Sequence, residues 1–146
     1  MQVKFQLVGA EELNRGLILL SDVYEAQARR VLKFGVRKGG RVIAEEMKVR
    51  LDSVTRGGTG KTRDSIGVFA APKGDLEGDE TAVAVGASKK RGFIARFLED
   101  GTSKMRARVH ATPAFESKQG EALNVIVSES TKALARAVKK IKKAPR

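Results

Sequence analysis

Apolar residues recur at intervals of three and four positions through the first third of the chain, and this spacing limits the fold more than any other feature. Such spacing places side chains on one face of a helix. Ser21 and Asp22 form a favourable N-cap pair, so we predict a break near them that divides the stretch into a helix pair. The recurring residues are Leu13, Leu17, Leu20, Tyr24, Ala28, Val31, Val36, Gly40, Ile43, Met47 and Leu51.

Two adjacent glycines, Gly39 and Gly40, lie inside this helical pattern. A glycine in a helix costs about 1 kcal/mol relative to alanine, so its presence needs a reason. Close packing of another backbone against the helix is one interpretation, and a second break in the helix is the other.

A second long helix is predicted at the C-terminal end. Its apolar positions again follow helical spacing: Leu123, Ile126, Val127, Ser130, Leu134, Val138 and Ile141. Between the two helical stretches, "GFIARFLEDG" predicts a short helix with Phe93, Ile94, Phe97 and Leu98 directed inward and Gly101 ending it. The basic segment "KMRARVHATPAF" after it predicts a further strand or an extended arm.

Alternating apolar and polar residues predict strands in three places. Val3, Phe5 and Leu7 alternate with polar residues at the N-terminus. The segments 66–70 and 82–86 alternate as well, and the acidic, glycine-rich stretch "PKGDLEGDE" joins them as a long hairpin connection. Grouped helices with a small antiparallel sheet define an α+β fold, and we expect one domain over residues 1–146.

The stretch "TRGGTGKTRDS" at 55–65 resembles half of a phosphate-binding loop, with Gly60, Lys61 and Thr62 in the order of that motif. A phosphate-binding loop must follow a strand and open a helix, because the helix N-terminus supplies N–H groups to the phosphates. Here the predicted order is helix, loop, strand. We therefore predict no nucleotide binding and interpret residues 55–64 as a flexible basic loop.

The sequence offers no set of residues that predicts catalysis. Its single histidine, His110, has no acidic residue near it in sequence; a packed histidine is favoured, with a ligand or general base as the alternative. Glu99 and Asp100 are adjacent and point in different directions, and Ser65 has no local base. There is no cysteine, so thiolate metal sites are excluded. We expect no catalytic, metal or cofactor site and no enzymatic activity.

The chain carries 29 Lys and Arg against 17 Asp and Glu, which gives a net charge of +12. Such a protein is attracted to polyanions, either DNA or an acidic protein surface. The cations gather in a C-terminal tail at about 132–146, where no acid occurs. In a helix they form a stripe opposite Val138 and Ile141; a frayed, solvated tail is the alternative. The predicted contact residues are Lys132, Arg136, Lys139, Lys140, Lys142 and Lys143.

No apolar run is long enough to span a membrane, and the N-terminus lacks a secretory signal. We expect synthesis in the cytoplasm and no membrane contact.

The order of several short motifs resembles the tail-completion, or head–tail joining, proteins of long-tailed phages. "VKFQLVGAEELNRGL" is similar to the opening strand and helix of that family, and "TGKTRDSIGV" to its entry into the hairpin. "ARFLEDGTSKMRARVHATPAFE" is similar to its Glu-x-Gly-Thr turn and Pro-Ala-Phe helix start. The matching positions that the resemblance marks as fold and interface residues are Thr59, Gly60, Ser65, Glu99, Gly101, Thr102, Pro113 and Phe115.

The resemblance implies a structural virion subunit in a ring, a hexamer, at the neck or top of the tail and made in the host bacterial cytoplasm. It also implies partners: further copies of itself, a head-side connector or head-completion protein, and a tail-terminator or tail-tube protein, with DNA passing through the lumen. Three other interpretations stay open: a stand-alone basic DNA-binding protein, a tail-terminator ring subunit, and a basic surface that only meets acidic proteins.

Overall fold

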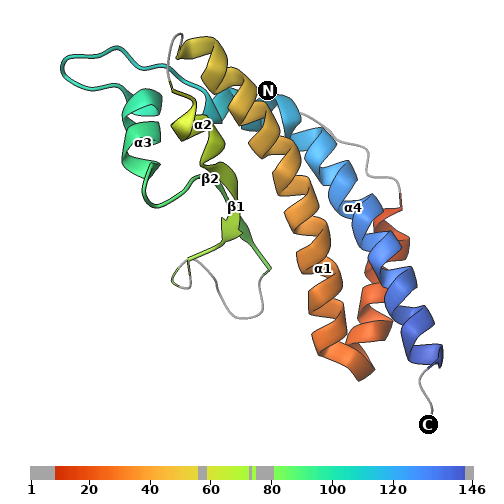
Figure 1. The fold of residues 1–146 in the computed structure, drawn as a ribbon. Helices are drawn as coiled ribbons and strands as arrows, with labels where there is room; N and C mark the ends of the chain where they lie inside the picture. Colours follow the sequence, from red (N-terminus) through yellow and green to blue (C-terminus); the bar gives the residue numbers. More distant parts are fainter. Residues whose placement is uncertain (1–8, 56–58, 73, 75–80, 144–146) are drawn as a thin grey trace.

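The fold consists of two long helices that pack together, with a two-stranded sheet on one of them (Figure 1). The computed structural model describes residues 9–55, 59–72, 74 and 81–143. The predicted strand at Val3–Leu7 lies outside the described residues. The α+β class predicted from the sequence is confirmed.

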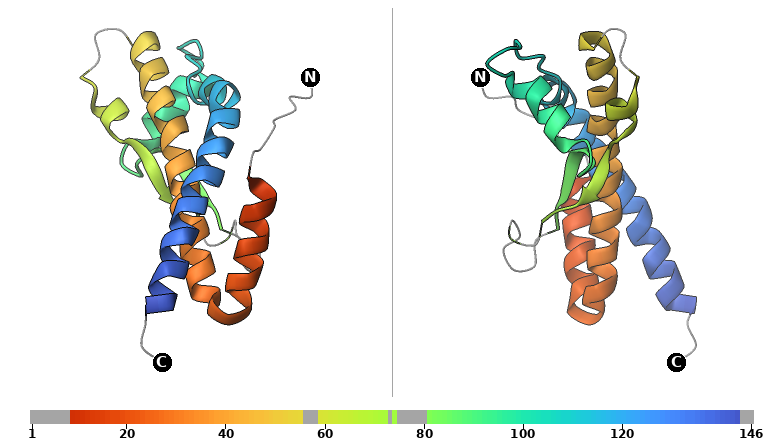
Figure 2. Two further views of the ribbon diagram at one scale, coloured as in Figure 1. Left: turned by 90° about the vertical axis from the view of Figure 1, so that its right-hand side faces the viewer. Right: turned by 60° about the vertical axis from the view of Figure 1, so that its left-hand side comes forward.

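Helix α1 spans Ala10–Val54 and reverses direction at Tyr24, whose backbone is not helical (φ −133°, ψ 62°). Residues 10–23, which we call the arm, fold back beside residues 25–54, the main part of α1 (Figure 2). The predicted break near Ser21 and Asp22 is thus confirmed, a few residues further along. Leu20 of the arm, with Ala28 and Val31 of the main part, forms one buried cluster against α4.

Helix α4 spans Ala111–Lys143 and runs antiparallel to the main part of α1 (Figure 1). The two backbones approach closely at glycines: a Cβ on Gly35 would lie 2.8 Å from the carbonyl oxygen of Ile126, and one on Gly39 would lie 2.8 Å from that of Ala122. The close-packing interpretation is therefore confirmed for Gly39. Gly40 instead faces Val68 and Val85 of the sheet, and the helix continues through both glycines without a second break.

The sheet pairs β1 (Ile66–Ala70) with β2 (Val83–Ala87) in antiparallel register, with Ile66 opposite Ala87. It packs on the last turns of α1, where Ile66 joins Met47 and Leu51 in a second buried cluster. The predicted hairpin is confirmed, with β2 shifted by one residue. Helix α2 (Lys61–Asp64) is a single turn between α1 and β1.

Helix α3 (Gly92–Asp100) is confirmed, and Gly101 ends it with a positive φ of 75°. The expectation that both phenylalanines point inward is wrong: Phe93 and Phe97 are 58% and 50% exposed, whereas Ile94 and Leu98 are partly buried. Successive residues of a helix point 100° apart, so Phe93 and Phe97 lie on a different face from Ile94 and Leu98. A short helix that packs on one side buries only one of these faces. The exposed rings cover each other edge to face, with centroids 6.2 Å apart.

The extended segment or strand predicted over 104–115 is confirmed only in part. Residues 106–110 are extended and form no strand, the one bridge here joins Thr102 to Met105, and residues 111–115 are the first residues of α4. Within the described ranges, no helix is both long and apolar enough to cross a membrane.

Candidate assembly surfaces

Glu99 caps the start of α4 from the neighbouring helix α3. Its carboxylate accepts hydrogen bonds from the backbone N–H groups of His110, Ala111 and Thr112 at 2.8, 2.9 and 3.0 Å, and from the Thr112 hydroxyl at 2.9 Å. The first N–H groups of a helix lack intrahelical partners, and a negative charge there also complements the helix dipole. Glu99 therefore fixes where α4 begins relative to α3.

The same hydrogen bonds determine the ionisation of Glu99. Partial burial by itself would raise the pKa of Glu99, but the four hydrogen bonds outweigh it and lower the pKa to about 2 from 4.5. The carboxylate is thus held in its charged, capping form.

His110 is a buried structural residue beside this cap. It is 1% exposed, and its Nδ1 lies 3.1 Å from Glu99 Oε2 and 3.3 Å from the carbonyl oxygen of Arg108. In the described part of the chain, no three His, Cys, Asp or Glu side chains are grouped so that they could hold a metal ion. The packed-histidine interpretation accounts for His110, and the pairing with Glu99, eleven positions away, was not visible in the sequence.

Most of the marked residues gather at this junction of α3 and α4. A Cβ on Gly101 would lie 2.8 Å from the backbone nitrogen of Ala107, so the chain can turn back on itself after α3 only with glycine at position 101. Thr102 donates its N–H to the carbonyl oxygen of Met105 at 2.8 Å and closes the turn. Pro113 lies in the first turn of α4, where its missing N–H costs no hydrogen bond, and Phe115, two residues further on, is 52% exposed.

Thr59, Gly60 and Ser65 lie apart from this junction, around the single turn of α2. They lie beside a polar hollow that Thr59, Gly60 and Arg63 line, where Arg63 forms an ion pair with Asp52 at 3.2 Å. Ser65 donates its hydroxyl to the carbonyl oxygen of Thr62 at 2.7 Å. Residues 61–64 of the loop expected at 55–64 form this helical turn, whereas residues 56–58 lie outside the described ranges. A strand does not precede the turn, so the arrangement lacks the context of a phosphate-binding loop.

The C-terminal cations form an exposed stripe along α4, and Ile141 on the opposite side packs against the buried cluster of the arm. Lys132 pairs with Glu129 at 3.4 Å. Arg136 lies over the ring of Phe34, 5.3 Å from its centroid, and Lys38 lies over the same ring at 5.4 Å. In the described ranges, no acidic side chain forms an ion pair with the remaining cations of the stripe, which are Lys139, Lys140, Lys142 and Lys143.

A second row of cations, which was not predicted from the sequence, runs along the main part of α1. Arg30, Lys33, Arg37 and Arg41 are exposed, and their spacing of three and four places them on one face of the helix. Phe34, with Arg136 and Lys38 over its ring, joins this α1 row to the α4 stripe. The periodic "RRVLKFGVRKGGR" was the signal that could have revealed the row. We call the combined surface the basic face.

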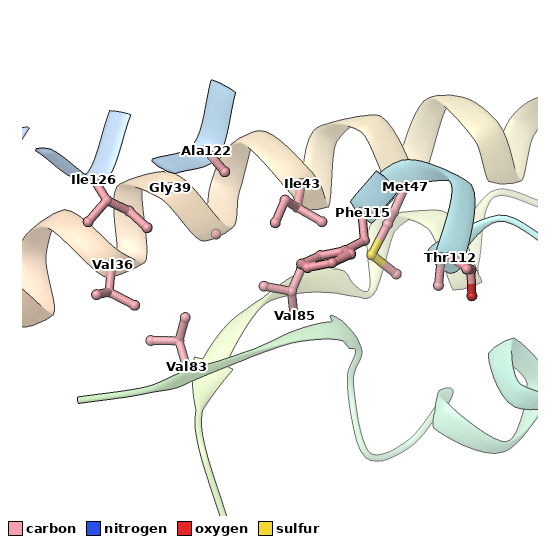
Figure 3. A pocket seen from close by; sticks show the side chains of 12 residues that line it. Val36, Gly39, Ile43, Met47, Val83, Val85, Thr112, Phe115, Ala122 and Ile126 are labelled. Atoms are coloured by element: carbon pink, nitrogen blue, oxygen red, sulfur yellow. The ribbon is translucent and has the colours of Figure 1, made fainter. Parts of the chain in front are cut away.

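An apolar groove opens between β2, the main part of α1 and the start of α4 (Figure 3). It has a volume of about 510 Å³. Figure 3 shows Phe115 reaching from α4 toward Val85 and Met47, with Ile43 above it. Of the 12 lining residues, Thr112 alone carries a side-chain oxygen or nitrogen. Such a groove is suited to an apolar segment and offers little to a charged ligand.

One comparison with known proteins identifies a family for the chain. The phage family HK97-gp10_like, described as "Bacteriophage HK97-gp10, putative tail-component", matches residues 18–101, more than half of the chain. The match runs from the arm through α3 and ends at Gly101. No curated protein and no solved structure matches the chain. The chain therefore belongs to the HK97-gp10-like family of phage tail components, structural virion proteins of the head–tail junction rather than enzymes.

Proposed function

We propose that the protein is a subunit of a ring at the phage neck, which joins the head-side connector to the tail and lets DNA pass through its lumen. Membership of a tail-component family supports a structural role in the virion. The resemblance noted in the sequence adds a tail-completion position, a hexameric ring, and neighbours on the head side and the tail side.

The basic face is the observation that carries the DNA-channel part of this proposal. Two antiparallel helices present cations side by side, and the α1 row has no ion-pair partner in the described part of the chain. Protein interfaces depend on a core of apolar anchors, whereas phosphate contacts depend on charge. Phe34, the aromatic ring that lies between the two rows, already has Lys38 and Arg136 over it. Duplex DNA therefore fits the basic face better than an acidic protein.

Base-specific recognition is not part of the proposal. A sequence reader needs side chains such as Asn or Gln that can reach base edges in a groove. The α1 row consists of Arg and Lys at the positions Arg30, Lys33, Arg37 and Arg41, which suit phosphates of any sequence.

A gene-deletion experiment tests the function. Phage that lack this protein should accumulate filled heads and separate tails of normal length, and the wild-type protein supplied in trans should restore joined particles. Separate tails of uncontrolled length would favour a tail-terminator ring instead. Normal virions from the deletion, together with absence of the protein from purified particles, would overturn the proposal and favour a stand-alone DNA-binding protein.

A further inference from the structure

Helix α3 carries two aromatic rings that point away from the core of the subunit. Phe93 and Phe97 are 58% and 50% exposed, and their rings pack edge to face. The opposite side of α3 is the one that packs, because Leu98 contacts the buried cluster that contains Met47 and Ile66. Figure 1 shows α3 at the outer margin of the fold. We call Phe93 and Phe97 the aromatic ridge.

The apolar groove does not receive the ridge of its own chain. Neither Phe93 nor Phe97 lines the groove, and Phe115, which does, is itself 52% exposed. Contiguous exposed apolar surfaces on folded proteins mark interaction sites. The subunit therefore presents an apolar projection and an apolar recess at two separate places.

The ridge and the groove agree in size and in chemistry. A cavity of about 150 Å³ holds one benzene molecule, so two phenyl rings need about 300 Å³. The groove has a volume of about 510 Å³, which accommodates both rings. Its walls include the aliphatic side chains of Ile43, Val83 and Val85, so the rings can enter without displacing polar partners.

The charges beside the two surfaces have opposite signs. Residues 89–97, which include the ridge, carry four cations and no acid: Lys89, Lys90, Arg91 and Arg96. Residues 111–121, which form one wall of the groove, carry two Glu and one Lys in a chain whose net charge is +12. Glu116, next to Phe115, is exposed and forms no ion pair in the described part of the chain. Such complementarity orients one surface toward the other.

We propose that the aromatic ridge of one subunit inserts into the apolar groove of a second copy of this chain, with the cations beside the ridge facing Glu116. The contact joins unlike surfaces, so each subunit gives its ridge to one neighbour and receives a ridge from another. A repeated contact of this kind closes a ring when the rotation between copies permits it. The inference rests on the proposed ring only in that copies of the chain meet, and it names the surfaces by which they do so.

Single-cysteine variants give a direct test, because the chain contains no cysteine of its own. Arg96→Cys lies between the two rings of the ridge in sequence, and Glu116→Cys lies beside the groove, so both variants keep all the aromatic side chains. The two proteins are mixed at concentrations at which sedimentation detects association of the wild type, and a short bismaleimide is added. The matched control mixes Arg96→Cys with Val49→Cys, which is 64% exposed and does not line the groove.

The 96–116 mixture should give a linked dimer at a yield several times that of the 96–49 mixture. Equal yields would overturn the proposal. Stronger 96–96 or 116–116 links would overturn it as well, because they indicate a symmetric contact between like surfaces. A wild type that stays monomeric at every concentration would also overturn the contact. The ring at the neck would then still be judged separately, by the deletion experiment described above.

Removal of the rings supplies a second readout that needs no cysteine. The double variant Phe93→Ser with Phe97→Ser should weaken association of the copies about tenfold or more, because buried aromatic anchors dominate binding at interfaces. The control is Leu19→Ser with Val49→Ser, which removes two other exposed apolar side chains, 72% and 64% exposed, from outside both surfaces. Equal weakening by the two double variants would contradict a defined ridge-and-groove contact.

Discussion

At the scale of single residues, Glu99 shows how one side chain connects three segments. It belongs to α3, caps α4 and contacts buried His110, so one carboxylate fixes the relation of two helices. The sequence marked Glu99 and Thr102 only through a family resemblance, whereas Gly101 was also predicted to end the short helix. The capping role could not be predicted, because it depends on the path of residues 101–110, which the left-handed Gly101 sets.

The lowered pKa of Glu99 predicts a specific pH dependence of stability. A group with a folded pKa below its unfolded value stabilises the protein above the unfolded pKa and loses this contribution as pH falls. Between about pH 4.5 and 2 the free energy of unfolding should therefore fall by an amount on the order of 3 kcal/mol from Glu99.

Denaturant titrations over this pH range test the assignment. Glu99→Gln should be less stable at pH 7 by about 2 kcal/mol, since the cap loses its charge, and should show a smaller loss of stability below pH 4.5. Asp100→Asn is the control, because the side chain of Asp100 is 65% exposed and pairs only with exposed Arg96. A wild-type pH profile in Glu99→Gln would show that Glu99 is not the group responsible.

At the scale of elements, the pairing of α1 with α4 rests on glycines that admit a neighbouring backbone. Helical periodicity predicted both helices, and the N-cap pair at Ser21 and Asp22 predicted a break in α1. Close packing of a backbone was one of two interpretations of Gly39. Periodicity did not predict which row of α3 is buried, because Phe93 and Ile94 are equally apolar in the pattern and only the contact with the sheet distinguishes them. The α1 cation row was also not predicted, because apolar residues and glycines separate most of its cations in the sequence, whereas those of the C-terminal tail are crowded together.

Gly35→Ala should destabilise the protein although alanine favours helix. The new methyl group would meet Ser130 Oγ and lie 2.8 Å from the carbonyl oxygen of Ile126, and overpacking of this kind typically costs about 1–3 kcal/mol. Gly92→Ala is the matched control, because no atom lies within 4 Å of a Cβ there. Thermal or denaturant unfolding measures both, and a Gly35→Ala protein as stable as Gly92→Ala would contradict the close approach of the helices.

At the scale of the whole molecule, the basic face and the apolar groove are separate surfaces with different chemistry. The basic face consists of cations on α1 and α4, whereas apolar side chains of β2, α1 and the start of α4 line the groove. None of the residues that line the groove belongs to the basic face, so a change on one surface can be tested without altering the other.

The salt dependence of DNA binding tests the basic face. Replacement of Arg30, Lys33, Arg37 and Arg41 with Gln should flatten the log–log slope by about 0.9 for each phosphate that the protein no longer neutralises. Replacement of Lys132, Arg136, Lys139 and Lys143 with Gln should flatten this slope by a similar amount, because both rows form one surface. The control replaces Lys89, Lys90, Lys104 and Arg106, which are exposed around α3, and removes the same charge.

Equal flattening by all three sets would indicate a general charge effect and no defined face. Weaker head–tail joining with an unchanged DNA slope would assign the α1 and α4 cations to an acidic protein partner instead.

The most direct measurement for the central claim is a cryo-electron microscopy reconstruction of the neck in intact virions. The account predicts a closed ring of this protein between the head-side connector and the tail, with the α1–α4 helix pair recognisable in each subunit and the basic face turned toward the DNA channel. A neck reconstruction in which every density is assigned to other proteins, from particles that contain none of this chain, would contradict it.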